Sequence, residues 1–326
     1  MSKTEKNLIS VQDLVVEYHS GGETIHAVNG VSFSLEKGKT IGLVGETGAG
    51  KTSIAKAILR ILPDHATQAV KGKIYFKGQE LLTLSEKEMC TQRGKNISMI
   101  FQDPMTALNP VKPVVDQIAE GLRRHQNMSK AQSVKEAVKM LEMVGISGDR
   151  AYEYPHQFSG GMKQRVVIAI ALACNPELLI ADEPTTALDV TIQAQVMELM
   201  KNLQKELGTA LILITHDLGV VAEACDSVAV VYAGEVVEYG SKEELFDHPS
   251  HPYTIGLFGA LPDLSKDVHR LSPVEGLPPD PSNLPEGCSF APRCSYATDA
   301  CKKAAVEMIK TGDTHMVRCL RCGKEG

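Results

Sequence analysis

The most constraining feature of this sequence is the segment GETGAGKT at residues 45–52, which follows the apolar stretch TIGLV. It matches the GxxxxGK[ST] pattern of a loop that leads from a strand into a helix and binds phosphate. Glycines let backbone N–H groups curl around a polyphosphate, and the helix N-terminus adds a positive partial charge. We expect Lys51 to reach the β and γ phosphates and Thr52 to ligate Mg²⁺. The predicted phosphate-loop residues are Gly45, Glu46, Thr47, Gly48, Ala49, Gly50, Lys51, Thr52 and Ser53.

A second motif, LLIADE at residues 178–183, is an apolar strand that ends in two acids. Carboxylates at the carboxyl end of a strand in an open α/β sheet lie where nucleotides bind. We expect Asp182 to belong to the Mg²⁺ shell and Glu183 to polarise the attacking water. Together the two motifs predict a nucleotide hydrolase.

The segment FSGGMKQR at residues 158–165 resembles the signature sequence of ABC-type ATPases, usually written LSGGQ. The resemblance implies an α/β P-loop NTPase with a RecA-like core, an antiparallel β subdomain and an inserted helical subdomain. It also implies that Ser159, Gly160 and Gly161 close over the γ-phosphate of an ATP held by a partner subunit. Two head-to-tail subunits then enclose two ATP molecules.

The signature departs from the commonest family pattern at two positions. Phe158 stands in place of Leu, and Met162 stands in place of Gln. Neither change removes a predicted phosphate ligand, because the Ser159 hydroxyl and the glycine amides remain. The FSGGM form resembles that of the peptide-importer branch of the family.

Four single residues resemble other functional positions of this family. Gln102 in MIFQDP resembles the Q-loop glutamine, which contacts Mg²⁺ or the attacking water. His216 in LILITHD resembles the switch histidine that bonds the γ-phosphate, and Asp189 in TALD resembles the D-loop aspartate of the dimer interface. Tyr18, late in a strand-like segment, is a candidate for stacking on adenine, with ordinary packing as the alternative. With Lys51 and Glu183, the glutamine and the histidine complete the predicted catalytic set.

The predicted layout has an ATPase domain over residues 1–250, with a helical subdomain inserted at about 90–172, and a C-terminal extension over 251–326. Apolar residues recur at helical spacing in SKAQSVKEAVKMLEMVG, and Gly145 supplies a stop. The AGE tripeptide inside SVAVVYAGEVVEYG predicts a hairpin turn.

Charge and hydropathy restrict the partners. The formal net charge is −6, so no surface built for nucleic-acid phosphates is expected. The longest apolar stretch, VVIAIALACNPELLIA, is interrupted by polar residues, and each half is shorter than the ~20 residues that a membrane-spanning helix needs. The first ten residues contain no apolar signal core. We therefore expect a peripheral protein on the cytoplasmic face of the membrane.

The partners follow from the resemblance. They are a second ABC ATPase subunit, either a copy or a paralogue, two membrane permease subunits, and indirectly an extracytoplasmic substrate-binding protein. A soluble ABC ATPase that acts on DNA or the ribosome is an alternative, but it predicts a basic face, long coiled coils or a second nucleotide domain.

The segment after residue 247 has a different character: HPYT, then a Pro-rich stretch, then a cysteine-rich end. It resembles the C-terminal region of ATP-binding subunits of oligopeptide, dipeptide and nickel importers. The resemblance implies an ATPase that powers peptide import. Import of nickel or another small solute is an alternative, and so is a metal or redox sensor in which nucleotide is regulatory.

Five cysteines fall in this C-terminal segment. Disulfides are disfavoured in a reducing cytosol, so the cysteines favour a thiolate metal site. The resemblance to some importers of this branch implies a [4Fe–4S] cluster, with Cys322 as an alternate ligand. Zinc and metal-free thiols are the alternatives, because four sulfur ligands suit both metals. The predicted cluster ligands are Cys288, Cys294, Cys301 and Cys319.

Overall fold

The computed structural model describes residues 6–186, 188–259 and 274–322. The chain divides into two compact units that each combine several segments. We name the first the signature unit; it contains the described residues of 1–8, 35–40 and 83–214. The second, the phosphate-loop unit, contains those of 9–34, 41–82 and 215–326.

The strands of the signature unit form a parallel set in the order β8, β7, β6. β7 pairs with β6 on one side and with β8 on the other, and Asp182 stands opposite Ile214. All residues of β7 and β8 are buried, as expected for parallel strands that read as continuous apolar runs. The bounds are β6 (Ile97–Ile100), β7 (Leu178–Asp182) and β8 (Ala210–Ile214).

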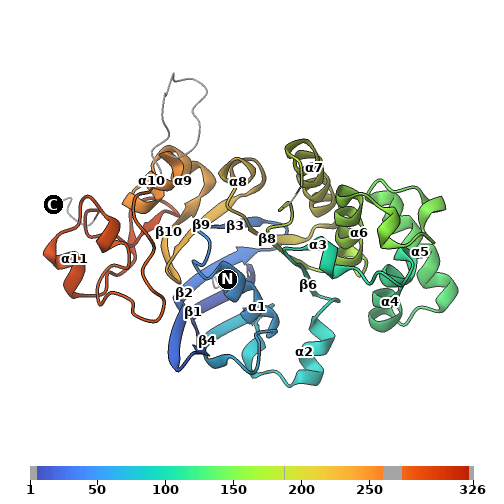
Figure 1. Cartoon of the computed structure of the whole chain (residues 1–326), viewed down its shortest axis with the longest axis horizontal. Helices are drawn as coiled ribbons and strands as arrows, with labels where there is room; N and C mark the ends of the chain where they lie inside the picture. Colours follow the sequence, from blue (N-terminus) through green and yellow to red (C-terminus); the bar gives the residue numbers. More distant parts are fainter. Residues whose placement is uncertain (1–5, 187, 260–273, 323–326) are drawn as a thin grey trace. The chain divides into compact units, whose positions relative to one another are not determined.

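The helices α4 (Val114–Gln126), α5 (Lys130–Met143) and α6 (Gly160–Leu172) of the signature unit pack against one another (Figure 1). The predicted helix at α5 is confirmed: Ser129 caps its start, and Gly145 takes φ +77° just beyond its end. β6 lies inside the range predicted as helical, because its short apolar run pairs with β7. The unit also contains α2 (Glu86–Gln92), α3 (Pro104–Ala107), α7 (Val190–Leu207) and the 3₁₀ turns η3 (Gly148–Arg150) and η4 (Pro155–Gln157).

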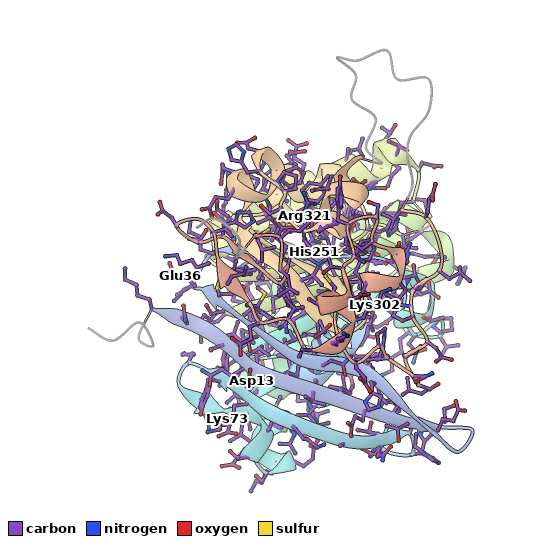
Figure 2. The ribbon with its side chains drawn as sticks, turned by 90° about the vertical axis from the view of Figure 1, so that its left-hand side faces the viewer. Asp13, Glu36, Lys73, His251, Lys302 and Arg321 are labelled. Atoms are coloured by element: carbon purple, nitrogen blue, oxygen red, sulfur yellow. The ribbon has the colours of Figure 1, made fainter. Side chains whose placement is uncertain are left out.

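The phosphate-loop unit contains an antiparallel sheet in the order β2, β1, β4, β5. A bulge interrupts the pairing of β1 with β4 after Gln12, and at that point the N–H of Asp13 donates to Ser32 Oγ. Figure 2 labels Asp13 and Lys73 on this sheet. The bounds are β1 (Asn7–Ser20), β2 (Glu23–Glu36), β4 (Thr67–Phe76) and β5 (Gln79–Glu80), followed by the 3₁₀ turn η2 (Leu81–Thr83).

A second set of strands in this unit begins with β3 (Thr40–Val44), which runs parallel to β9 (Ser227–Tyr232). The hairpin predicted from AGE is confirmed, since β10 (Glu235–Ser241) pairs antiparallel with β9. Ala233 and Gly234 between the strands take φ of +47° and +79°, as a tight hairpin turn requires. The hairpin continues into β12 (Met316–Val317) and β11 (Ile309–Lys310).

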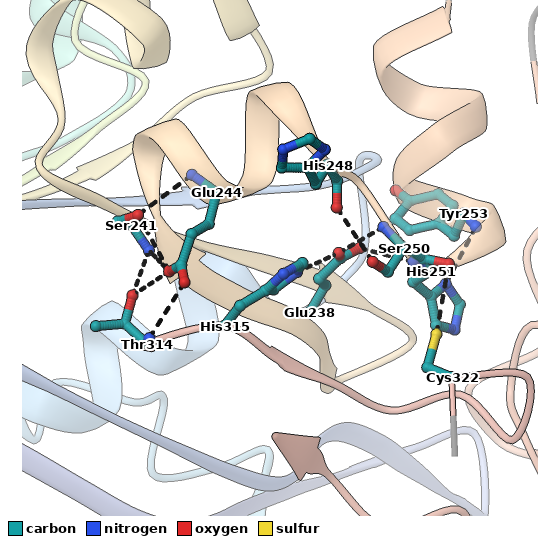
Figure 3. A network of polar contacts seen from close by, with 10 residues as sticks. All are labelled: Glu238, Ser241, Glu244, His248, Ser250, His251, Tyr253, Thr314, His315 and Cys322. Carbon is teal, nitrogen blue, oxygen red and sulfur yellow. Dashed lines mark hydrogen bonds and ion pairs between the residues drawn. The ribbon is translucent and has the colours of Figure 1, made fainter. Parts of the chain in front are cut away.

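A buried carboxylate fastens the C-terminal segment to the hairpin (Figure 3). Glu238 of β10 is fully buried, accepts hydrogen bonds from the N–H groups of Ser250 and His251, and lies 2.7 Å from Nε2 of His315. Because a buried carboxyl group needs hydrogen-bond partners, this network holds the start of α10 and the residue before β12, the strand between Cys301 and Cys319. The helices of the unit are α1 (Lys51–Leu59), α8 (Leu218–Ala224), α9 (Lys242–Asp247), α10 (Pro252–Gly259), η5 (Ala291–Arg293) and α11 (Asp299–Lys303).

Candidate functional site

The predicted phosphate loop joins β3 to α1, and two of its glycines are required by the packing. Gly45 takes φ +150°, and a Cβ there would lie 2.0 Å from the carbonyl oxygen of Val231. Gly50 takes φ +99°, and its Cβ would lie 2.2 Å from the carbonyl oxygen of Ala27. Any other residue would displace the backbone, so the loop conformation depends on these glycines.

Lys51 folds back over the loop. Its side chain is almost completely buried, and Nζ donates to the carbonyl oxygens of Gly45 and Glu46 at 2.7 and 2.9 Å. The hydroxyl of Tyr18 donates to Oγ of Ser53 at 3.0 Å, so this ring lies beside the first turn of α1. Tyr18 therefore lies beside the predicted phosphate loop, and its stacking on adenine stays a prediction.

The C-terminal segment binds Glu46, a contact that no sequence pattern predicted. Arg293 donates to both carboxylate oxygens of Glu46 at 2.8 and 3.0 Å and to the hydroxyl of Tyr232 at 3.2 Å. The backbone N–H of Glu46 donates to the hydroxyl of Tyr253 at 2.9 Å. Both the carboxylate and the amide of this loop residue thus bind the C-terminal segment. Hydrogen bonds to Glu46 hold the pKa of Arg293 above its usual range, although burial acts in the opposite direction.

The two acids of LLIADE lie at the end of β7 in the signature unit. Asp182 is buried, whereas the carboxylate of Glu183 accepts hydrogen bonds from Gln102 Nε2 and Thr186 Oγ1, each at 2.9 Å. Glu183 takes φ +48°, an unusual conformation for a residue with a Cβ. Such strain is concentrated at functional sites. The structure therefore brings together two members of the predicted catalytic set, and it adds Thr186, which sequence reasoning did not identify.

The signature motif starts helix α6. Ser159 is the N-cap, and its Oγ accepts a hydrogen bond from the N–H of Met162. Phe158 is buried and lies beneath the guanidinium of Arg150, 4.6 Å from the ring centroid. The aromatic residue at this position therefore has a packing role. A Cβ at Gly161 would lie 2.6 Å from a methyl group of Ile192.

The remaining predicted residues lie at element ends. Asp189 is exposed at the N-cap position of α7, and His216 is exposed shortly after β8. Thr52 and Ser53 are half-buried in the first turn of α1, and Thr47 is exposed in the loop.

Four of the five C-terminal cysteines line one cavity, together with apolar residues such as Phe290 and Val306. Burial raises the pKa of the Cys288 thiol, while N–H groups of Phe290 and Ala291 directed at its sulfur act to lower it. Cys322 does not line this cavity; burial and the neighbouring Cys319 raise its pKa to about 11. The cavity cysteines are Cys288, Cys294, Cys301 and Cys319.

Within the described residues, no three His, Cys, Asp or Glu side chains converge closely enough to bind one metal ion. Zinc needs such convergence because one ion takes all four ligands. An iron–sulfur cluster does not, because each cysteine binds its own iron atom and N–H groups commonly bond the sulfurs. The described residues thus offer four thiols around one cavity, without a preformed site for a single ion.

A phosphate loop and a strand that ends in Asp-Glu define the class of P-loop nucleotide hydrolases. Residues 28–186 match the family model "ABC transporter", and residues 237–301 match "Oligopeptide/dipeptide transporter, C-terminal region". Among solved structures, the dimeric ATP-binding cassette MJ0796 bound to ADP and Pi is 28% identical, with a TM-score of 0.64, and the match covers 72% of this chain and 98% of that one. CbiO1 from Clostridium perfringens is 27% identical with a TM-score of 0.63, covering 78% and 96%.

Sequence relatives narrow the class. The dipeptide transport ATP-binding protein DppD of Bacillus subtilis is 50% identical over 96% of this chain and 94% of its own length. The oligopeptide transport ATP-binding protein OppD of Escherichia coli is 49% identical over 91% and 88%. The chain belongs to the oligopeptide/dipeptide family of ABC transporter ATP-binding proteins, and it is an ABC transporter ATPase with the predicted mixed α/β fold and antiparallel β subdomain. No helix in the described parts of the chain is both long and apolar enough to cross a membrane.

Proposed function

We propose that this chain binds ATP and Mg²⁺ and that its ATP hydrolysis drives the import of dipeptides or oligopeptides. Lys51 neutralises charge on the β and γ phosphates, and Thr52, Asp182 and Gln102 supply oxygen ligands for Mg²⁺. The observation that carries the proposal is Glu183, whose backbone takes φ +48° and whose carboxylate accepts a hydrogen bond from Gln102 Nε2 at 2.9 Å. Such a carboxylate is suited to orient an attacking water.

The second half of each ATP site comes from a partner subunit. Ser159, Gly160 and Gly161 present a helix N-terminus that suits the γ-phosphate bound by the partner. His216 bonds the γ-phosphate from the same chain, Asp189 reaches across the dimer interface, and Tyr18 stacks on adenine. Closure of the pair around two ATP molecules then performs the mechanical work.

Glu183→Gln tests this assignment. ATP hydrolysis should fall at least about 100-fold with ATP binding retained, because the amide cannot act as a base. The matched control is Glu198→Gln, which alters an exposed glutamate of α7. Phosphate release is measured in the assembled transporter and binding by nucleotide titration. Hydrolysis at the wild-type rate in Glu183→Gln rejects the proposed base.

The assembly that we propose contains a second ABC ATPase subunit, two membrane permease subunits and, on the other side of the membrane, a substrate-binding protein. This places the chain as a peripheral protein at the cytoplasmic face of the membrane. Family membership supports this arrangement, and so does the match to DppD over 96% of this chain and 94% of that protein. Affinity purification from detergent-solubilised membranes, followed by subunit identification, tests it; recovery of the chain without permease subunits contradicts it.

Two finer proposals concern the C-terminal segment. Residues 251–326 act as an extension of an ATPase domain that spans 1–250 and carries a helical insertion at about 90–172. Cys288, Cys294, Cys301 and Cys319 hold a [4Fe–4S] cluster, which supplies a redox-active group when bound. The shared cavity and the N–H groups directed at Cys288 support this ligand set.

Visible absorption of anaerobically purified protein tests the cluster. We expect a broad band near 400 nm, the region typical of iron–sulfur charge transfer. Cys301→Ser should remove the band and Cys322→Ser should leave it. A colourless protein with one bound zinc contradicts the cluster.

A further inference from the structure

The ion pair between Arg293 and Glu46 joins the C-terminal segment to the phosphate loop. These two parts of the phosphate-loop unit are far apart in the sequence. Arg293 is only 4% exposed, and its guanidinium uses both terminal nitrogens on the carboxylate of Glu46. Bidentate pairs of this kind fix geometry as well as supplying energy. Glu46 is the second residue of the phosphate loop, so the pair acts directly on the backbone that surrounds the phosphates.

Backbone carbonyl groups of the C-terminal segment also bind Arg293. Its Nε donates to the carbonyl oxygen of Glu275 at 2.8 Å, and Nη2 donates to that of Val274 at 3.0 Å. The guanidinium also lies over the rings of Tyr232 and Phe290, 5.7 and 5.9 Å from their centroids. The arginine is therefore pre-oriented, and little side-chain freedom is lost on binding Glu46.

A packed cluster of aromatic rings connects the surroundings of Arg293 to the cysteine cavity. Phe290 lines the cavity, lies 5.3 and 5.5 Å from the rings of Tyr232 and Tyr253, and immediately precedes the turn η5 that carries Arg293. The N–H of Cys294 closes this turn by bonding the carbonyl oxygen of Ala291. A change in the conformation of η5 or Cys294 therefore moves Arg293 or strains its ion pair with Glu46.

We infer that Arg293 is a positioning residue for the phosphate loop. Through Arg293, the conformation of the residues that line the cysteine cavity sets the ATP affinity of the same subunit. The side-chain hydrogen bonds of Arg293 go to Glu46, to the Tyr232 hydroxyl and to two backbone carbonyl oxygens. It acts by holding Glu46, while Tyr253 holds the amide of that residue from a second direction.

The first test measures binding of a fluorescent methylanthraniloyl-ATP to the full-length chain. Arg293→Met should weaken binding about five- to tenfold, with kcat at saturating ATP changed less than about twofold, because loop geometry and not the reacting groups is altered. Glu46→Gln should weaken binding similarly, and the double variant no further than either single one. Arg293→Lys should restore part of the affinity.

The matched control is Arg318→Met. Arg318 also anchors the C-terminal segment, by donating to the carbonyl oxygens of Val236 and Val306, but it has no bond to the loop. A purely structural ion pair predicts a lower unfolding midpoint for Arg293→Met with unchanged ATP affinity, and that outcome overturns the inference. Because Glu46 is partly exposed, Glu46→Gln keeps the test decisive if Arg293→Met does not fold.

The second test uses Cys301→Ser, which alters the cavity without touching Arg293. It should weaken ATP binding in the wild-type background and have no additional effect beside Arg293→Met. Unchanged affinity, or equal weakening in both backgrounds, overturns the transmission through Arg293. Failure of the wild-type chain to bind the probe contradicts the proposed ATP site itself, which distinguishes the two failures.

Discussion

The phosphate loop and the signature motif each lie at the start of a helix, but the chain supports them differently. The phosphate loop is enclosed by its own chain: carbonyl oxygens leave no space for a Cβ at Gly45, and Arg293 grips Glu46. At the signature motif, Ser159 and Gly160 are exposed, and a Cβ at Gly161 would meet one γ-methyl group of Ile192 and no backbone. The phosphate loop is thus supported from within its own unit, whereas the start of the signature helix is exposed.

Gly45→Ala should produce the largest effect, because its Cβ would meet backbone at 2.0 Å and its φ suits only glycine. We expect ATP binding to weaken at least about 100-fold in nucleotide titrations, since several kcal/mol of strain enter the loop. Gly48→Ala is the control. It also has positive φ, but a Cβ there meets nothing within 4 Å. Equal losses in both variants would show that crowding by the chain is unimportant.

Acid should destabilise the phosphate-loop unit before it destabilises the signature unit. Burial, reinforced by Arg318, lowers the pKa of His251 to about 4 from 6.5, and its Nδ1 accepts the N–H of Tyr253 (Figure 3). The unfolded state therefore binds more protons below pH 6.5, and stability that is complete above this pH is lost as the pH falls towards 4. Between pH 6.5 and 5 the loss is about 2 kcal/mol.

Amide hydrogen exchange, corrected for intrinsic rates, measures this loss. Protection in α10 should decrease over that range while protection in α6 changes less. His251→Asn should flatten the pH dependence in α10. A parallel decrease in both helices would assign the acid sensitivity to the whole chain.

Gly161→Ala should have a smaller effect on stability, about 1–2 kcal/mol in urea unfolding, because the added methyl group crowds one side-chain methyl group of Ile192 and no backbone. ATP binding by the isolated subunit should stay within about twofold of wild type. ATP hydrolysis by the assembled transporter should fall, since the added methyl group lies at the face offered to the partner. Weakened binding in the isolated subunit would contradict the division of roles.

The smallest effect is expected at Gln164 in α6, whose side chain is fully buried with neither polar atom hydrogen-bonded in the described structure. Gln164→Leu should raise the free energy of unfolding by about 1 kcal/mol, because unsatisfied polar atoms are removed. Gln204→Leu is the control. Its Nε2 donates to the carbonyl oxygen of Gly38 at 2.8 Å, so stability should fall instead. Destabilisation by both substitutions would indicate that Gln164 has a partner.

Local patterns accounted for much of the fold and of the site. The Ser129 cap, the Gly145 stop and the Ala233–Gly234 turn each depend on a few neighbouring residues, so they can be predicted from short windows. The contact of Gln102 with Glu183 was not predicted: the two residues were identified separately, and they are 81 positions apart. No pattern pointed to Arg293, since neither its turn nor Glu46 has a local reason for charge.

The pairing of Arg293 with Glu46 links residues that are 247 positions apart. During synthesis, the ribosome therefore makes the phosphate loop long before it makes the arginine that steadies it. A nascent or truncated chain contains every recognisable ATP motif and still lacks this last support. Translation itself thus delays full nucleotide affinity until the C-terminal segment has emerged and folded.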